Sequence, residues 1–220
     1  MTTESLELLY FFDPLCGWCY AGAPALQGLA ERHGAALRMM PVGLFMQPRP
    51  IAAIAEHAWH NDQRIAELTG QRFSDSYRTQ VLLAPQGVFD STALTRALVA
   101  LGEHDAALEP RLLHVTQLAR YVDGVDTCRA DVVAGIAVTV AASAGLALDA
   151  DDFATRLHDD ETLAAITQRR VSDARRAMHN LASTGVPQLL LRVKGHTEVL
   201  AGQALYSGAD ALLERIETAT

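Results

Sequence analysis

The chain has 220 residues, of which 50% are hydrophobic and 20% charged, and its net charge is −8. This is the composition of an ordinary globular protein, and the acidic balance argues against a nucleic-acid-binding protein, which usually displays a basic stripe. No apolar run reaches the ~20 residues of a membrane span, and the first residues lack the basic and apolar regions of a signal peptide. We therefore expect a protein that stays in the cytoplasm and does not bind a membrane.

The chain begins with the pattern of a strand, a helix and a second strand. Residues 6–12 form a continuous apolar run, which indicates a strand covered on both faces. Residues 16–33 have a helical pattern in which Pro24 should cause a kink, and Gly34 is available as a left-handed C-cap. Residues 35–44 are again apolar, so this part of the chain predicts a βαβ unit.

The strand pattern then disappears for well over a hundred residues. Helical patterns follow at about residues 51–69, 74–80, 92–103, 107–122, 127–144, 151–158 and 161–182, with a loop predicted at 82–89. The short connections between these helices predict a helical bundle. Asp126-Thr127 is the candidate N-cap of one helix. We interpret the arginine pairs at 169–170 and 175–176 as a solvated helix face.

Strand patterns return after residue 185. Residues 189–193 and 197–200 predict two strands joined by a hairpin turn, and residues 207–217 predict a closing amphipathic helix. A βαβ piece and a ββα piece therefore bracket a helical insertion. We predict one composite α/β fold, with a discontinuous domain of residues 1–48 and 184–220 and an insertion domain of residues 49–183.

Cys16 and Cys19 form a Cys-x-x-Cys pair where the first strand gives way to a helix, which is a typical place for a dithiol–disulfide centre. The unpaired N–H groups and the dipole of the first helical turn favour a thiolate on the outer sulfur, that of Cys16. Its attack on a substrate disulfide would give a mixed disulfide that Cys19 resolves. A zinc site would need at least two further ligands. Since Cys128 stands alone, we predict a redox centre and no metal.

Two further residues near this chemistry have simpler interpretations. Asp13 ends the first apolar run and precedes a proline, so we interpret it as a turn residue, with proton transfer at Cys19 as the alternative role. Cys128 follows a predicted N-cap, and we interpret it as an inert helix residue.

The order of these elements, together with the stretch from Asp13 to Pro24 that contains Asp-Pro-Leu-Cys-Gly-Trp-Cys-Tyr, resembles the thioredoxin-fold DsbA family and is similar to its FrnE-like branch. Gly185-Val186-Pro187 before a strand resembles that family's cis-proline loop. The resemblance implies a cis bond before Pro187 and a Val186 backbone that pairs with substrate. Trp18 is either an aromatic residue that packs on substrate or a lid over the cysteines.

The resemblance implies a thiol–disulfide oxidoreductase with a thioredoxin-like fold. It would act on protein or small-molecule disulfides without a bound cofactor, and a cellular thiol reductant or oxidant would reset it. Because Gly17-Trp18 brings no charge or strong donor, we expect a centre less oxidising than one with a histidine there. We make no prediction of the oligomeric state.

Two alternatives from other classes stay open. Kappa-class glutathione transferases and hydroxychromene-carboxylate isomerases have a similar helical insertion, but their sites are centred on a serine, and glutathione would then be a cosubstrate. The second alternative is a non-catalytic binding or chaperone-like protein that uses an apolar groove between the insertion and the sheet.

Overall fold

The computed structural model describes residues 6–179, 181 and 185–219, and its sheet is built around β1 (Glu7–Phe12). β1 pairs in parallel with β2 (Leu37–Pro41) and antiparallel with β5 (Gln188–Val193). β5 in turn pairs antiparallel with β6 (His196–Ala201), which gives the strand order β2-β1-β5-β6. Residues 8–12 are all buried, as expected for a continuous apolar strand covered on both faces.

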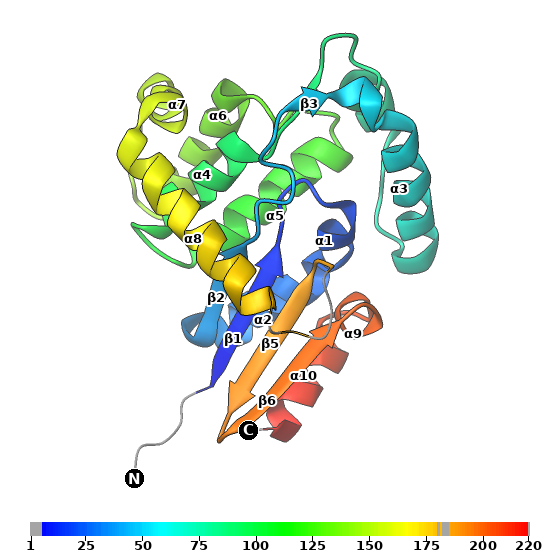
Figure 1. Ribbon diagram of the computed structural model, residues 1–220, viewed down its shortest axis with the longest axis vertical. Coiled ribbons are helices and arrows are strands. Elements are labelled where there is room, and N and C mark those ends of the chain that lie inside the picture. Colours follow the sequence, from blue (N-terminus) through cyan, green and yellow to red (C-terminus); the bar gives the residue numbers. More distant parts are fainter. Residues whose placement is uncertain (1–5, 180, 182–184, 220) are drawn as a thin grey trace.

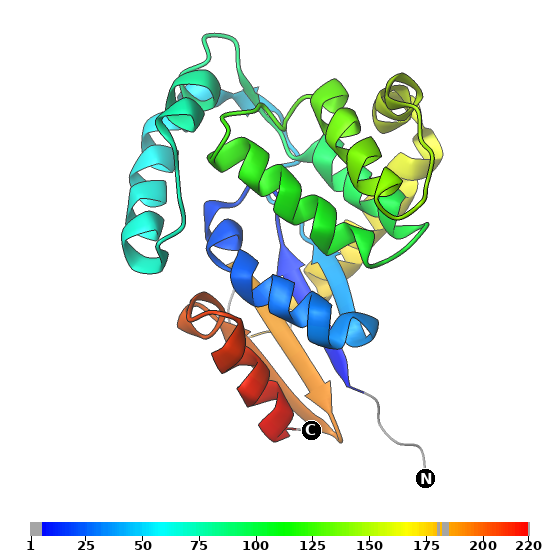
Figure 2. The ribbon, with the colours of Figure 1, turned by 180° about the vertical axis from the view of Figure 1, so that it is seen from behind.

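Helices cover both faces of this sheet. α2 (Ala23–His33) and α10 (Ala209–Ala219) pack side by side on one face, and α8 (Glu161–His179) crosses the other (Figures 1 and 2). On the α8 side, Phe11 and Leu190 of the sheet pack with Ala174 of α8 in a small buried cluster. The α/β class and the thioredoxin-like order of elements predicted from the sequence are confirmed.

The first predicted helix is in fact two helices. α1 (Gly17–Ala21) ends at Gly22, and α2 begins at the next residue with Pro24 in its first turn. The kink expected at Pro24 is therefore a break two residues earlier, at Gly22, because proline is tolerated in a first turn but not in a helix interior. The left-handed cap expected at Gly34 is wrong: this residue has φ −54° and begins a short 3-10 turn.

The segment between β2 and β5 is mainly helical and lies over one end of the sheet (Figure 1). Its elements are β3 (Arg49–Pro50), the 3-10 turn η2 (Ile51–Ala53), α3 (Ala55–Thr69), the π-helical turn η3 (Tyr77–Leu82), β4 (Val88–Phe89), α4 (Thr92–Gly102), α5 (Leu108–Tyr121), α6 (Ala130–Ala142) and α7 (Ala150–Asp159), followed by α8. A further short helix, α9 (Gln203–Tyr206), precedes α10.

Three local features of this segment differ from the sequence prediction. β4, which pairs with β3 over two residues, lies inside the loop predicted at residues 82–89, because so short a pairing leaves no periodicity to detect. The helix expected from residue 127 begins at Ala130. The Asp126 carboxylate caps the preceding turn instead, by accepting the N–H of Cys128 at 3.1 Å.

Two arginines that we had placed on a solvated face attach α8 to the sheet. Arg170 forms two hydrogen bonds with the Glu109 carboxylate of α5, at 2.8 and 3.0 Å, and donates to the Met39 carbonyl of β2 at 2.8 Å. Arg175 donates to the carbonyls of Val42 and Gly43, each at 2.7 Å. The solvated-face interpretation therefore holds for only one member of each pair: Arg169 is exposed, and the exposed Arg176 pairs with Asp173 on the same helix.

No helix within the described residues has the length and apolar character that crossing a bilayer requires. A large cluster of buried apolar side chains continues from the sheet into the helices above it. Leu8 and Leu191 belong to this cluster, and so do Leu98 of α4 and Leu112 of α5. The sheet and the helical segment thus share buried packing.

The turn after α5 gives a stability test with a matched control. Gly124 and Gly145 both have positive φ, +73° and +79°, but a Cβ at Gly124 would lie 2.6 Å from the Ser76 backbone, whereas a Cβ at Gly145 meets nothing within 4 Å. Each alanine substitution should lower the free energy of unfolding by about 1–2 kcal/mol, because alanine disfavours the left-handed backbone conformation. We expect Gly124→Ala to lower the free energy of unfolding further, in urea titrations, because the backbone at Ser76 must move. Equal losses for the two variants would contradict this account.

Candidate active site

The two cysteines lie at the end of β1, where the chain turns into α1. Cys16 is the N-cap residue of α1, and Cys19 follows within its first turn. Their exposed fractions are 8% and 1%, so Cys16 is the outer residue and Cys19 the deeper one, and both are free thiols. Because α1 has only five residues, it supplies unpaired N–H groups near Cys16 but a smaller dipole than the long helix we had expected.

The loop before β5 forms the other wall of the site. The Sγ atom of Cys16 lies 3.9 Å from the carbonyl oxygen of Val186, and the peptide bond between Val186 and Pro187 is cis. A Cβ added at Gly22 would lie 3.5 Å from the Pro187 ring, so this loop also contacts the break between α1 and α2. Residues about 170 positions apart in sequence thus meet at one end of the sheet.

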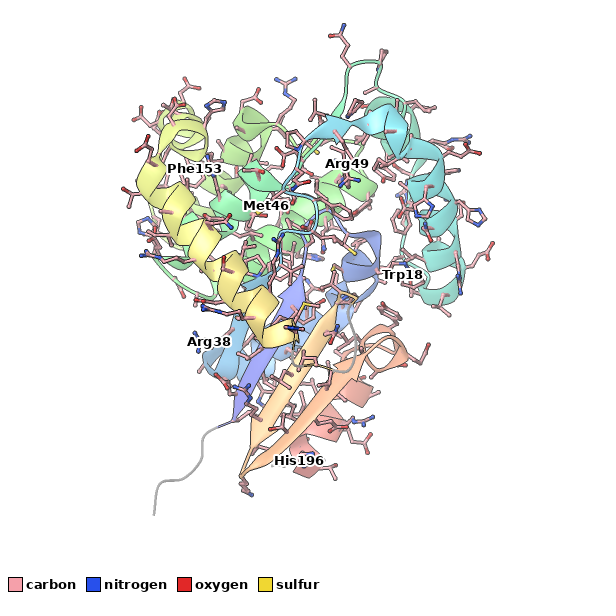
Figure 3. The ribbon with its side chains drawn as sticks, viewed as in Figure 1. Trp18, Arg38, Met46, Arg49, Phe153 and His196 are labelled. Atoms are coloured by element: carbon pink, nitrogen blue, oxygen red, sulfur yellow. The ribbon has the colours of Figure 1, made fainter. Side chains whose placement is uncertain are left out.

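Trp18 is the second residue of α1 and lies at the end of the sheet opposite the hairpin that carries His196 (Figure 3). Its ring centroid is 5.4 Å from that of Tyr206 in α9, and the indole is partly buried against the core. The structure therefore places Trp18 next to the cysteines and packed on a second aromatic ring. Tyr206 was not singled out in the sequence, because no local pattern connects α9 with α1.

The buried surroundings of Cys19 keep its thiol protonated. Burial raises the pKa of the Cys19 thiol well above its usual range, and the adjacent Cys16 raises it further, while a hydrogen bond from the Asp13 backbone acts in the opposite direction. Cys19 is therefore a protonated thiol at neutral pH. It must lose this proton before it can attack a disulfide.

Tyr10 is a polar residue beneath the cysteines that the sequence analysis missed. Its hydroxyl is buried against Gly22, where an added Cβ would lie 3.0 Å away, and it has no hydrogen-bond partner among the described residues. Burial raises the pKa of Tyr10 well above its usual range, and the charges of Cys19 and Cys16 add to this effect. The available signal was a tyrosine with leucine on one side and phenylalanine on the other in the buried part of β1.

Asp13 is completely buried and holds three segments together. Its Oδ1 atom accepts the N–H of Leu15 at 3.0 Å, and its Oδ2 atom accepts the N–H of Phe45 at 3.0 Å and the hydroxyl of Ser91 at 3.1 Å. Burial raises the pKa of Asp13 from 3.8 to about 6, although these hydrogen bonds favour the ionised form. Asp13 is a turn residue as expected, but it also connects β1 to the segments after β2 and before α4.

An aromatic cluster supports the cysteine loop from the side of α5. The hydroxyl of Tyr121 donates to the Leu15 carbonyl at 2.9 Å, and its ring stacks on Tyr20 with centroids 4.8 Å apart. The Phe73 ring meets both tyrosines edge-on. In addition, the side-chain amide of Gln71 donates to the Tyr20 carbonyl at 2.8 Å. The inserted segment therefore fixes the residues on either side of the cysteine pair.

Cys128 lies in the turn before α6 and is not part of the helix in which we had placed it. Its Sγ atom is 3.6 Å from Nη1 of Arg120, a fully buried arginine that also lies 3.8 Å from the Asp126 carboxylate. Burial raises the pKa of Cys128, and the charge of Arg120 partly offsets this. Its surroundings are those of a structural residue.

The part of the chain that the structure describes contains no group of three histidine, cysteine, aspartate or glutamate side chains that could hold a metal ion. His57, the first of two histidines one turn apart on α3, instead lies beside Asn61, with its Nε2 atom 2.9 Å from the side-chain amide.

Comparison with known proteins places this arrangement in a family. Residues 7–212 match the family described as DSBA-like thioredoxin domain. Comparison with curated proteins found no match. The cytosolic disulfide reductase DsbM from Pseudomonas aeruginosa is 30% identical, with a TM-score of 0.78 over 97% of this chain and 100% of that protein. Its structure with GSH gives a TM-score of 0.76 at the same identity, over 97% and 98% of the two chains.

More distant structures share the fold alone. A protein from Nitrosomonas europaea is 20% identical, with a TM-score of 0.68 over 98% of this chain and 97% of that one. A 2-hydroxychromene-2-carboxylate isomerase is 17% identical, with a TM-score of 0.51 over 96% of this chain and 93% of that one. The fold by itself therefore does not separate redox chemistry from isomerisation.

The buried carboxyl of Asp13 predicts a specific dependence of stability on pH. Because the folded protein holds this proton more tightly than the unfolded chain, its contribution to the free energy of unfolding should fall as the pH rises from 3.8 to about 6, and stay low above that. Asp13→Asn lacks this titration. We expect the stability difference, wild type minus Asp13→Asn, to fall by on the order of 2–3 kcal/mol between pH 4 and pH 7 in urea unfolding.

The exposed Asp75 provides the control. The difference between wild type and Asp75→Asn should stay nearly constant over the same interval. A constant difference for Asp13→Asn as well would show that its carboxyl is not held protonated by the fold.

Proposed function

Because the chain belongs to the family of DSBA-like thioredoxin domains, we propose that it is a thiol–disulfide oxidoreductase with Cys16 as nucleophile and Cys19 as resolving thiol. The observation that carries this proposal is the arrangement of the pair. The Cys16 sulfur is the outer one and faces the Val186 carbonyl at 3.9 Å, while Cys19 is buried one turn deeper.

The proposed reduction of a disulfide has two steps. The Cys16 thiolate attacks one sulfur of the substrate disulfide; a bond forms between Cys16 and that sulfur, and the other substrate sulfur leaves as a thiolate. Cys19 then loses its proton and attacks the Cys16 sulfur, which releases the second substrate thiolate and leaves a disulfide between Cys16 and Cys19. Two electrons pass from the enzyme dithiol to the substrate, and the leaving thiolates take up protons from water.

We propose that substrate lies along the loop of Val186 and Pro187, with Trp18 at the rim. The Val186 carbonyl is an acceptor beside the nucleophile, and an extended substrate segment that donates to it would bring its disulfide to Cys16. This mode of binding uses backbone groups, so it would accept substrates of different sequence.

The direction of electron flow and the compartment are part of the same proposal. A relative that is 30% identical is described as a cytosolic disulfide reductase, and one of its structures contains GSH. We propose that this chain likewise reduces disulfides in the cytoplasm, with no bound cofactor, and that glutathione is the thiol that resets the pair. Two glutathione thiols would reduce the Cys16–Cys19 disulfide and leave as oxidised glutathione. The motif from Asp13 to Pro24 supports a place in the FrnE-like branch.

A glutathione-dependent isomerase is the second candidate, because a 2-hydroxychromene-2-carboxylate isomerase shares the fold at a TM-score of 0.51. The cysteine pair favours the oxidoreductase: an isomerase that only binds and activates glutathione has no use for a buried resolving thiol such as Cys19. Isomerisation that requires glutathione but survives Cys19→Ser would favour the second candidate.

Removing the nucleophile should abolish the activity. We expect Cys16→Ser to reduce insulin disulfides at the uncatalysed rate, because a serine hydroxyl is not ionised at neutral pH and cannot form the mixed disulfide. Cys128→Ser should retain the wild-type rate, because Cys128 lies beside Arg120 in the turn before α6 and has no part in the proposed reaction. Unchanged insulin reduction by Cys16→Ser would favour a non-catalytic binding protein.

Removing the resolving thiol should trap substrates. In Cys19→Ser, the mixed disulfide at Cys16 has no internal thiol to resolve it, so adducts should accumulate and appear on non-reducing gels of cytoplasmic extract. The double variant Cys16→Ser/Cys19→Ser is the control and should trap nothing. If Cys19→Ser also forms no adduct with protein or glutathione, the two-step mechanism is wrong.

A further inference from the structure

Asp62 is a buried carboxylate of the inserted helix α3, which lies alongside α1 in both views of the ribbon (Figures 1 and 2). Only 4% of Asp62 is exposed. The Tyr77 hydroxyl donates to its Oδ2 atom at 3.0 Å. Neither residue was singled out in the sequence, and the reaction proposed above does not use them.

The second carboxylate oxygen of Asp62 lies against the residue that follows the nucleophile. A Cβ added at Gly17 would be 2.5 Å from Oδ1 of Asp62 and 3.1 Å from the Ile65 side chain. The carboxylate therefore occupies the space that any other residue at position 17 would need. Because Gly17 directly follows Cys16, and consecutive Cα atoms are about 3.8 Å apart, the carboxylate lies against the immediate neighbour of the nucleophile.

The charged and titratable groups around Asp62 come from three sides. Tyr77 approaches from η3, Arg120 and Tyr121 approach from α5, and Cys16 precedes Gly17 at the start of α1. Burial raises the pKa of Asp62 to about 7, while the Tyr77 hydrogen bond and the Arg120 charge act in the opposite direction. The carboxyl thus changes its charge in the pH range in which cytoplasmic enzymes work.

We propose that Asp62 is a positioning residue that disfavours the thiolate of Cys16 and thereby makes the cysteine pair more reducing. A negative charge near a thiolate raises the free energy of the thiolate relative to the thiol. A pair whose reduced form is less stabilised gives up its electrons more readily. This inference rests on the proposed function of the pair, and it assigns to the helical insertion a direct influence on the redox chemistry.

Asp62→Asn is the decisive variant, because the amide keeps the shape and an oxygen that accepts from Tyr77 while it removes the charge. In a Cys128→Ser background, the thiolate absorbance of Cys16 should titrate at lower pH than in the parent. At pH 8, the equilibrium with glutathione should shift about tenfold toward the dithiol, the equivalent of one pKa unit.

The dependence on pH separates an electrostatic role from a structural one. Below pH 6 the carboxyl of Asp62 is neutral, so the parent and Asp62→Asn should agree, and their difference should grow as the pH passes through about 7. A packing defect would give a difference at every pH. Tyr77→Phe removes the donor to Oδ2. In this second variant the Asp62 carboxyl should ionise only at higher pH, so its destabilisation of the Cys16 thiolate should also begin at higher pH.

Glu67 provides the matched control, since it is an exposed carboxylate on the same helix. Glu67→Gln removes the same charge as Asp62→Asn, but from a side chain exposed to solvent. It should change the equilibrium constant between the cysteine pair and glutathione less than twofold. The proposal would be overturned if the parent and Asp62→Asn had equal reduction potentials at pH 8. It would also be overturned if Glu67→Gln shifted the glutathione equilibrium as much as Asp62→Asn does. Those results would leave the proposed function intact, whereas a parent protein that exchanges no disulfide with glutathione or insulin would refute the function itself.

Discussion

The carboxylate of Asp13 is the constraint on which the site depends. It accepts hydrogen bonds from Leu15, Phe45 and Ser91, and so connects the end of β1 to the segment after β2 and to the start of α4. A buried carboxylate without such donors would cost several kcal/mol. These bonds hold the turn that delivers Cys16 to the start of α1, so the position of the nucleophile relative to the Val186 carbonyl follows from them.

The residues close to the cysteines in sequence were the predictable part of the molecule. The apolar run at 6–12, the position of the Cys16 and Cys19 pair, and the strands on either side of the helical segment followed from periodicity and turn residues. These patterns, with the family resemblance, were sufficient for the fold. The division into residues 1–48 with 184–220 and 49–183 stays a prediction, and the buried cluster that spans the sheet and the helices shows how closely the two parts pack.

The contacts between distant segments were not predictable, because they leave no local signal. The contact of Asp62 with Gly17 joins two helices whose sequences contain nothing that relates them. The same holds for Tyr206 beside Trp18. The break at Gly22 was mislocated at Pro24 for a different reason, since proline is acceptable one residue into a new helix and the interruption falls before it. Sequence patterns thus located the nucleophile but not the groups that surround it.

The arginines of α8 also have a consequence for how copies of the protein behave toward one another. β2 is an edge strand, and an edge strand with free backbone acceptors can pair with the edge of a second molecule. Arg170 binds the carbonyl of Met39, and Arg175 binds those of Val42 and Gly43 just beyond the strand. The same side chains that fasten a helix to the sheet therefore protect this edge against aggregation in a crowded solution.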